Sequence, residues 1–374
     1  MCNRVPKLAR PVKIKDVPNL GLAIHGDGMT TRHDTDPPRP AVSARHVAEE
    51  AGVSRSAVSR TFTPGASVAP ATRARVLAAA ERLGYHVNHL ARGLTGTSTG
   101  IVALIVSELE TPFRAGVVAA LTEGLQAAGK VAMVINTDGP GDGVERALRQ
   151  AISYRTDAAI LLSGRPDPAL ATLCARNGLR LVLINRDDDF PDALHIRLND
   201  TDCGERAFAM LRDAGCRRVA VATSRSATAS LRLRAEGFRD AARRAGVASD
   251  AVALGATSYA AGREIGDRLL GGQAPPDGIF CTTDLIACGV IDAARDRGGL
   301  RIPQDLRVIG FDDIPQAGWD AYRLTTFGQP IEGIVDACVA WLDQETAGPR
   351  TVELEARRVV RASCAGGGSV IPCR

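Results

Sequence analysis

The sequence lacks several features that would place it in large classes of proteins. No apolar run approaches the ~20 residues that a membrane-spanning helix requires, and the basic, proline-broken first residues contain no signal-peptide core. The nine cysteines stand singly, with no CxxC pair and no cysteine–histidine cluster at zinc spacing. We therefore expect a cytoplasmic protein with no membrane partner, in which the thiols are buried or inert rather than metal or redox ligands.

The motifs of common enzyme classes are missing as well. The sequence has no glycine-rich phosphate loop, no GxSxG motif and no metal-spaced ligands. The stretch Gly139-Pro140-Gly141 indicates only a loop. We therefore expect no catalytic residue, no cofactor and no bound metal. The alternative, an enzyme built on a parallel α/β fold, would need one of these motifs.

What the sequence does contain is an uneven distribution of charge. The 374 residues suit two or three domains, and the formal net charge of +4 is unremarkable for that length. Residues 41–95, however, contain seven arginines and three acids, and this difference equals the whole excess. Such local asymmetry is typical of a nucleic-acid-binding module.

The same segment has the periodicity of three short helices. Apolar residues after Ser43 recur at helical spacing until Gly52, which ends the first helix. Ser54 is placed to cap a second helix. Pro70 is placed to begin a third, which Gly84 ends and whose expected apolar stripe is Val76, Leu77, Ala80 and Leu83. Two helices joined by a short turn that contains glycine form a helix-turn-helix, whose second helix enters the major groove of DNA.

The second helix has a polar face suited to DNA. Arg55 and Ser59 are four residues apart, as are Ser56 and Arg60, so all four side chains lie on one face. No acid interrupts that face, and arginines with hydroxyls suit base edges and phosphates. A plain three-helix bundle would explain the apolar stripes equally well, but it would not explain this basic face.

The segments on either side of the three helices have less regular patterns. Residues 1–40 show no sustained periodicity and predict a disordered extension, unless Met29 is the true start of the protein. Residues 88–94 suit a helix of about two turns, which is marginal in isolation, and Gly93 weakens it by about 1 kcal/mol relative to alanine. A segment balanced between coil and helix is suited to a switch.

From Gly100 onward, apolar strands alternate with amphipathic helices. This order predicts parallel sheets buried on both faces, and its length predicts two doubly wound lobes with a ligand cleft at the carboxyl ends of their strands. The expected strands are 101–106, 131–136, 158–163, 179–185, 218–223, 278–282 and 306–311. The expected helices include 113–128, 204–214, 230–245, 259–270, 285–297 and 331–342.

With these residues identified, the chain resembles the lactose-repressor (LacI/GalR) family of bacterial transcriptional regulators over roughly residues 42–364. The motifs that carry the resemblance are VAEEAGVSRSAVSR (47–60), TRARVLAAAERLGY (72–85), LARGL (90–94), RAEGF (234–238), FCTTDLIACGVI (280–291), IPQDLRVIGFDD (302–313) and LTTFGQP (324–330). The resemblance implies a helix-turn-helix domain (41–86), a hinge helix and linker (87–98), a two-lobed effector and dimerisation domain like periplasmic binding proteins (99–364), and a tail (365–374).

The resemblance also implies DNA-contacting residues. In the recognition helix, Arg55, Ser56 and Arg60 would read bases, while Ser43 and Ser59 would lie near phosphates. Leu94 matches the hinge leucine that the family inserts into the minor groove. The full implied set is Ser43, Ser54, Arg55, Ser56, Ser59, Arg60, Asn88, Ala91, Arg92 and Leu94.

For the effector, the resemblance implies a cleft between the lobes. The first lobe would be about 99–197 with 329–349, and the second about 198–328 with the terminal strand. The implied ligand residues are Phe113, Asn185, Arg186, Ser230, Arg234, Asp284 and Asp312. An arginine and an aspartate facing one cleft suit a sugar or sugar acid, although Arg234 and Asp312 would also suit an ordinary ion pair between lobes.

The resemblance therefore implies a homodimeric regulator, by default a repressor, that binds a palindromic double-stranded operator under the control of a small effector. An inducer and a corepressor would use the same residues, so the sign of control stays open. A solute-binding protein that serves a transporter is the alternative from another class. Such a protein would need an export signal and would have no helix-turn-helix. The sequence contains a helix-turn-helix pattern and no signal-peptide core.

Overall fold

The computed structural model describes residues 42–63, 65–86, 98–137, 142–186, 190–226, 228–344 and 350–364. The chain divides into two compact units, 1–87 and 88–374. The expectations for residues 1–40, for the hinge helix at 88–94 and for the tail at 365–374 fall outside the described residues.

The first unit contains the three helices that the sequence predicts: α1 (Ala44–Ala51), α2 (Arg55–Thr61) and α3 (Pro70–Leu83). Gly52 and Gly84 end α1 and α3 with φ values of 59° and 62°, a left-handed conformation that glycine adopts without steric cost. Val47, Val58 and Val76, one from each helix, are fully or almost fully buried and form the centre of a small core.

The predicted apolar stripe of α3 is wrong at one position. Leu77 is 46% exposed, whereas Ala79 is completely buried beside Val76 and Ala80. On a helix, positions 76, 79 and 80 share one face, and position 77 is turned about 100° from position 76. The structure therefore has a narrower buried stripe than the sequence suggested.

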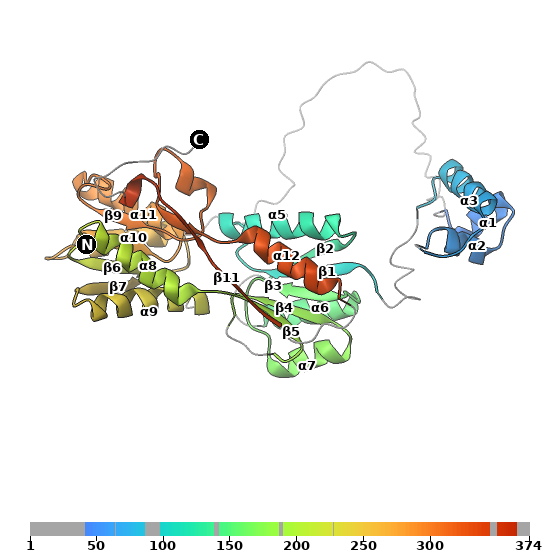
Figure 1. Ribbon diagram of the computed structural model, residues 1–374, viewed down its shortest axis with the longest axis horizontal. Helices are drawn as coiled ribbons and strands as arrows, with labels where there is room; N and C mark the ends of the chain where they lie inside the picture. Colours follow the sequence, from blue (N-terminus) through green and yellow to red (C-terminus); the bar gives the residue numbers. More distant parts are fainter. Residues whose placement is uncertain are drawn as a thin grey trace, which may run out of the picture. The chain divides into compact units, whose positions relative to one another are not determined.

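The second unit contains two doubly wound lobes (Figure 1). In the described residues, the larger sheet has the order β11-β5-β4-β3-β1-β2 and is parallel throughout. Its strands are β1 (Ile101–Val106), β2 (Val131–Asn136), β3 (Ala158–Leu161), β4 (Arg180–Ile184), β5 (Ala193–Leu198) and β11 (Arg350–Leu354).

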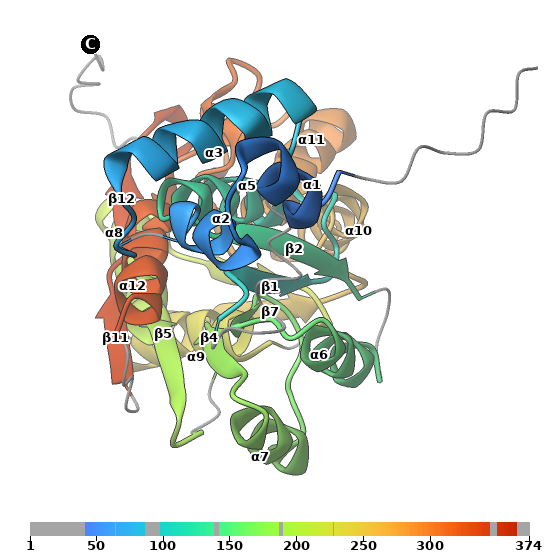
Figure 2. The same ribbon diagram turned by 90° about the vertical axis from the view of Figure 1, so that its right-hand side faces the viewer.

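Helices cover both faces of the larger sheet. The apolar side chains of α5 (Pro112–Ala127) and α12 (Ile331–Leu342) pack against one face, and those of α6 (Gly143–Ser153) and α7 (Pro168–Arg176) against the other (Figures 1 and 2). Edge strand β2 departs from the expected burial, because Val131 and Val134 are 60% and 44% exposed.

The smaller sheet has the order β7-β6-β8-β9 and is also parallel. Its strands are β6 (Val219–Thr223), β7 (Ser249–Ala253), β8 (Gly278–Cys281) and β9 (Arg307–Ile309). One face packs against α8 (Asp200–Asp213) and α9 (Ala229–Arg244), and the other against α10 (Tyr259–Leu270) and α11 (Asp284–Gly298). The alternation of strands and helices therefore predicted the architecture correctly, although β5, β7, α6 and α7 were not among the expected elements.

The end of the chain crosses between the lobes. The terminal strand was expected in the second lobe, and β12 (Arg357–Val359) lies there, paired antiparallel with β10 (Thr326–Gly328). The preceding strand β11, which had been assigned to neither lobe, joins the first sheet beside β5. Leu354 is at this crossing and packs against the apolar cores of both lobes. This apolar contact stabilises the path of the chain from β11 into the second lobe.

No helix in the described part of the chain is long and apolar enough to span a membrane.

We expect Gly204→Ala to destabilise the second lobe. Helices α8 and α9 approach so closely that a Cβ at position 204 would lie 2.2 Å from the Arg234 carbonyl oxygen and 2.8 Å from the Phe238 nitrogen. Overpacking against backbone atoms costs about 1–3 kcal/mol, so the urea midpoint of unfolding should fall. Gly272→Ala is the control, because its Cβ would meet nothing nearer than the Leu269 carbonyl oxygen at 3.7 Å. Equal midpoints for the two variants would contradict this account.

Candidate functional site

Helix α2 presents the basic face that the sequence predicts. Arg55, Ser56, Ser59 and Arg60 are all exposed, while Val58 on the opposite side is buried. The Ser54 hydroxyl oxygen accepts a hydrogen bond from the Ala57 N–H at 3.3 Å and so caps the helix as expected. Ser43 is exposed at the start of α1, whereas Asn88, Ala91, Arg92 and Leu94 lie outside the described residues.

The other arginines near this face have structural partners. Arg73 donates to the Thr61 carbonyl oxygen at 2.8 Å, and Arg75 donates to the Gly52 carbonyl oxygen at 3.0 Å. Arg45 and Arg82 pair with glutamates of α1, at 2.8 and 3.0 Å. No described acid pairs with Arg55 or Arg60. Among the described arginines of this unit, only the two on α2 are therefore without an acidic or backbone partner, a distinction that counting charges in the sequence could not make.

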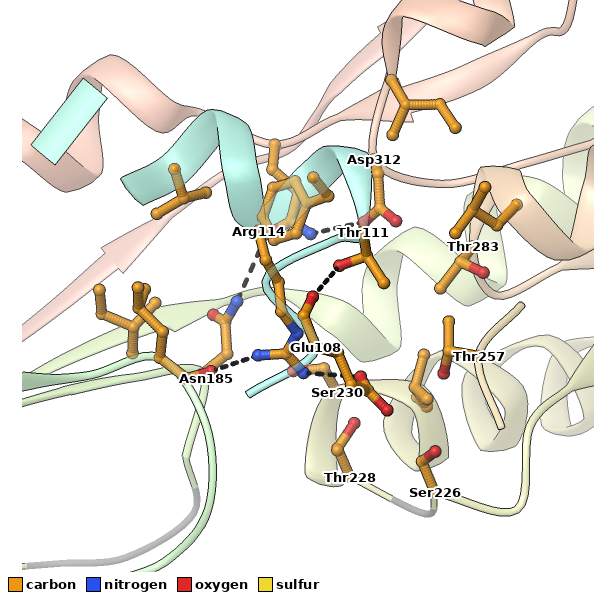
Figure 3. Close-up of a pocket in the computed structure, with 18 of the residues that line it drawn as sticks. Glu108, Thr111, Arg114, Asn185, Ser226, Thr228, Ser230, Thr257, Thr283 and Asp312 are labelled. Carbon is orange, nitrogen blue, oxygen red and sulfur yellow. Dashed lines mark hydrogen bonds and ion pairs between the residues drawn. The ribbon is translucent and has the colours of Figure 1, made fainter. Parts of the chain in front are cut away.

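The second unit contains a cavity of about 120 Å³ between its lobes (Figure 3). Its lining follows the carboxyl ends of strands from both sheets, which is where ligands bind in parallel α/β folds. Six of the seven predicted effector residues line it: Phe113, Asn185, Arg186, Ser230, Arg234 and Asp312. Phe113 packs against the apolar cores of both lobes. A movement of one lobe relative to the other would therefore change its contacts.

Arg234 is anchored within the second lobe. Its side chain is 3% exposed, and its Nε donates to Asp200 Oδ1 at 2.7 Å. Its Nη1 donates to the Thr282 carbonyl oxygen at 3.0 Å and lies 3.9 Å from Asp312 Oδ1. The guanidinium carbon lies 3.4 Å from the centroid of the Phe311 ring. An ion pair between lobes was the alternative for Arg234, but its closest acid is Asp200, which belongs to the same lobe.

Asp284 is the one predicted effector residue that does not line the cavity. It is completely buried at the start of α11, where its carboxylate accepts from the Ile314 N–H at 3.0 Å and from the Thr326 hydroxyl at 2.6 Å. Burial is the main cause that raises the pKa of Asp284 to about 7, and the nearby Asp312 carboxylate raises it further. These contacts join α11 to the turn after β9 and to β10.

Several residues of the cavity escaped the sequence reasoning. Arg114, next to Phe113 on α5, donates to the Leu162 carbonyl oxygen at 2.8 Å and to the Ser163 hydroxyl. Burial lowers the pKa of Arg114, and the nearby Glu108 carboxylate opposes that effect. The second lobe contributes hydroxyl side chains beside the predicted Ser230: Ser226, Thr228, Thr257 and Thr283. Their positions in the segments that follow β6, β7 and β8 were the available signal, since the carboxyl ends of parallel strands share one edge.

Some polar atoms in the lining have no hydrogen-bond partner among the described residues. Asn185 Oδ1 and Thr283 Oγ1 are buried and accept no hydrogen bond from any described residue. Figure 3 shows these two side chains on opposite sides of the cavity. An unsatisfied buried polar atom costs about 1–3 kcal/mol, which a hydroxylated ligand with its own donors can offset.

The described residues contain no group of three or more histidines, cysteines or acids placed to hold a metal ion. Their seven cysteines are free and buried. Burial raises the pKa of the Cys174 thiol to about 11, which leaves it protonated at neutral pH and poorly nucleophilic.

Comparison with known proteins finds the same two kinds of domain. The family model described as "Bacterial regulatory proteins, lacI family" matches residues 45–88, and the model described as "Periplasmic binding protein-like domain" matches residues 208–364. The transcriptional regulator CelR of Thermobifida fusca is 30% identical over 331 residues, which cover 85% of this chain and 96% of CelR. Catabolite control protein A of Priestia megaterium is 28% identical over 330 residues, covering 86% of this chain and 99% of that protein.

Solved structures show the same fold. The lac repressor dimer bound to operator and the anti-inducer ONPF superposes with a TM-score of 0.77 at 23% identity, covering 87% of this chain and 99% of the repressor. The complex of CelR with cellobiose gives a TM-score of 0.63 at 28% identity, covering 86% of this chain and 99% of CelR.

A helix-turn-helix with an exposed basic face and a two-lobed domain like periplasmic binding proteins define a DNA-binding transcription regulator rather than an enzyme. The chain belongs to the lacI family of bacterial regulatory proteins.

We expect Asp284→Asn to change the dependence of stability on pH. Since the folded pKa of about 7 exceeds the ordinary carboxyl value, the folded state binds more protons between these values, and stability falls as the pH rises toward 7. From pH 5 to 8 the wild type should lose about 2 kcal/mol of unfolding free energy through this group, whereas the neutral asparagine removes that loss. Urea unfolding at both pH values measures the difference. Asp305→Asn, which removes an exposed acid, should keep the wild-type loss. If Asp305→Asn also removed the loss, the effect would belong to general charge and not to Asp284.

Proposed function

We propose that this protein is a repressor that binds a near-palindromic double-stranded DNA operator as a homodimer in the cytoplasm. A small hydroxylated metabolite, a sugar or sugar acid, would control it from the cavity between the lobes. In this proposal residues 41–86 bind DNA and 87–98 form a hinge. Residues 99–364 bind effector and dimerise, and the ends 1–40 and 365–374 are extensions.

The observation that carries the DNA-binding role is the basic face of α2. Arg55 and Arg60 are exposed without acidic partners on the second helix of a helix-turn-helix, the element that enters the major groove. Arginine pairs with guanine through two parallel hydrogen bonds, so these side chains are assigned base contacts. Ser56 is assigned a base contact as well. Ser43 and Ser59 are assigned positions near phosphates, and Leu94 of the hinge is assigned to the minor groove. Ser54, Asn88, Ala91 and Arg92 complete the proposed DNA-binding set.

The effector role is supported by the lining of the cavity. Carboxylate, guanidinium and amide groups converge there with a set of hydroxyl side chains, a mixture that suits a polyol better than an apolar ligand. The relative CelR is solved as a complex with cellobiose, which favours a carbohydrate here too. We assign Phe113, Asn185, Arg186, Ser230, Arg234 and Asp312 to ligand contact. Asp284 does not contact the ligand in this proposal. It accepts a hydrogen bond from the Ile314 N–H and so holds the turn that carries Asp312.

The mechanism we propose is a population shift between two arrangements of the lobes. A ligand that contacts both lobes stabilises the arrangement in which those contacts are all made, by its difference in affinity for the two. In a dimer, that shift would alter the distance between the paired hinge segments and so the affinity for the operator.

The function as a whole is tested by selecting DNA. Purified full-length protein is incubated with fragmented genomic DNA from its source at about 150 mM salt, which suppresses sequence-blind electrostatic binding, and the retained DNA is sequenced. Enrichment of one palindromic site supports the proposal. Uniform retention of all fragments would mean that the basic face binds DNA without sequence specificity, which would contradict the proposal.

We expect Arg60→Ala to relax base preference at one position in each half-site. Loss of a bidentate contact with guanine removes about 1–3 kcal/mol of discrimination at that base pair and leaves the other positions unchanged. Binding to a library of single-base operator variants measures this. Arg82→Ala is the control, since Arg82 pairs with Glu50 on the surface of the same unit. An equal loss of affinity for every DNA sequence would make Arg60 a phosphate contact.

We expect Asp312→Asn to lose the effector response while it keeps operator affinity. Asparagine tolerates the positive φ of 122° at this position but removes the charge that would accept from ligand hydroxyls. Release of the selected operator is measured with cellobiose, common hexoses and pentoses, and their aldonic and uronic acids. A wild-type response that persists in the variant would place effector recognition elsewhere.

A further inference from the structure

Gln329 occupies a crossing between the two lobes. Strand β10 ends at Gly328, which forms a bridge with Asp312 of the second lobe. Helix α12 begins at Ile331, and its buried side chains pack on the sheet of the first lobe. Gln329 lines the effector cavity between these two connections.

Gln329 forms hydrogen bonds with one predicted ligand residue from each lobe. Its Nε2 donates to Asp312 Oδ1 at 2.7 Å, and its Oε1 accepts from Asn185 Nδ2 at 3.4 Å. Asn185 follows β4 and Asp312 follows β9, and both have positive φ values, 55° and 122°. Residues other than glycine adopt such conformations rarely, so the backbone holds both side chains in position at some cost in strain.

The chemistry of the three groups fixes the direction of these hydrogen bonds. The orientation of an amide is assigned from its network, and here the network starts at a carboxylate, which only accepts. Gln329 must therefore turn its NH₂ toward Asp312 and its carbonyl oxygen toward Asn185. Asn185 must then donate through its NH₂, which leaves its Oδ1 as the buried acceptor without a partner among the described residues.

We propose that Gln329 is a positioning residue that links the lobes and sets Asn185 as a hydrogen-bond acceptor toward the effector. The proposal rests on the proposed function and narrows it, because the effector must place a donor, such as a sugar hydroxyl, at Asn185 Oδ1. A group that only accepts, such as a carboxylate, is excluded from that point. A carboxylate of a sugar acid would have to lie elsewhere in the cavity.

The charges around Asp312 determine when this direction holds. Arg234 on α9 lies 3.9 Å away, while Arg114 on α5, Asp200 on α8 and Asp284 on α11 also act on the carboxylate. Burial raises the pKa of Asp312 to about 6, while Arg234 and the hydrogen bond from Gln329 oppose that rise. At neutral pH the carboxylate is ionised and the direction is as described. A protonated Asp312 can donate to the Gln329 oxygen, which reverses both amides.

The test uses the full-length protein free of DNA and effector, with ¹⁵N in the side-chain amides of asparagine and glutamine. NMR spectra are recorded from pH 7.5 to 4.5, and the two amides are assigned from Asn185→Ala and Gln329→Met. We expect the Gln329 and Asn185 amide signals to shift together with one midpoint. In Gln329→Met the Asn185 shift should disappear, and in Asp312→Asn both amides should stop titrating.

Gln344→Met is the matched control, because Gln344 is exposed at the end of α12 and its loss should leave the Asn185 titration unchanged. The proposal is overturned if Asn185 titrates identically without Gln329, if Gln329 titrates while Asn185 does not, or if neither amide moves. Each of these readouts is independent of DNA. A failure of the operator selection can therefore be distinguished from a failure of the proposed hydrogen-bond network of Asp312, Gln329 and Asn185.

Discussion

The buried guanidinium of Arg234 is the interaction on which the effector half of the molecule depends. A cation with 3% exposure is tolerated only when its charge and its donors are matched, because transfer from water costs several kcal/mol. Asp200 supplies the charge, the Thr282 carbonyl oxygen accepts a hydrogen bond, and the Phe311 ring covers one face. These partners come from the start of α8 and the ends of β8 and β9. One side chain therefore holds together the carboxyl edge of the second sheet, where the cavity opens.

The same edge contains a second buried charged group that is held by hydrogen bonds. Asp284 is completely buried, and its carboxylate accepts from Ile314 and Thr326, which fixes the turn that carries Asp312. Asp312, which lines the cavity, is thus held in place by a residue that does not line it. Sequence similarity alone gives both aspartates the same role, whereas their burial and partners separate them.

Features of the fold that depend on residues close together in the sequence could be predicted, whereas features that depend on distant elements could not. The start of α2 follows from a serine cap, and the bounds of α3 follow from a proline at its first position and a glycine after its last, all within a few residues. The exposure of Leu77, the position of β11 and the role of Arg114 depend on which distant elements pack nearby. No periodicity within a window of ten residues contains that information. Arg73 and Arg75 illustrate the limit, since they count as basic residues in the sequence but bind backbone carbonyl oxygens in the fold.

The crossings between the lobes combine apolar and polar contacts in a way that suits a two-state device. In the described residues the chain crosses after β5, after β10 and after β11. Leu354, at the last crossing, packs against both cores, and apolar contact of this kind has little directional preference, so it permits small rotations. Gln329, at the second crossing, instead makes directional hydrogen bonds to one residue of each lobe. A ligand that donates to Asn185 strengthens a network that already joins the two lobes, and so its binding energy acts on the relative position of the lobes.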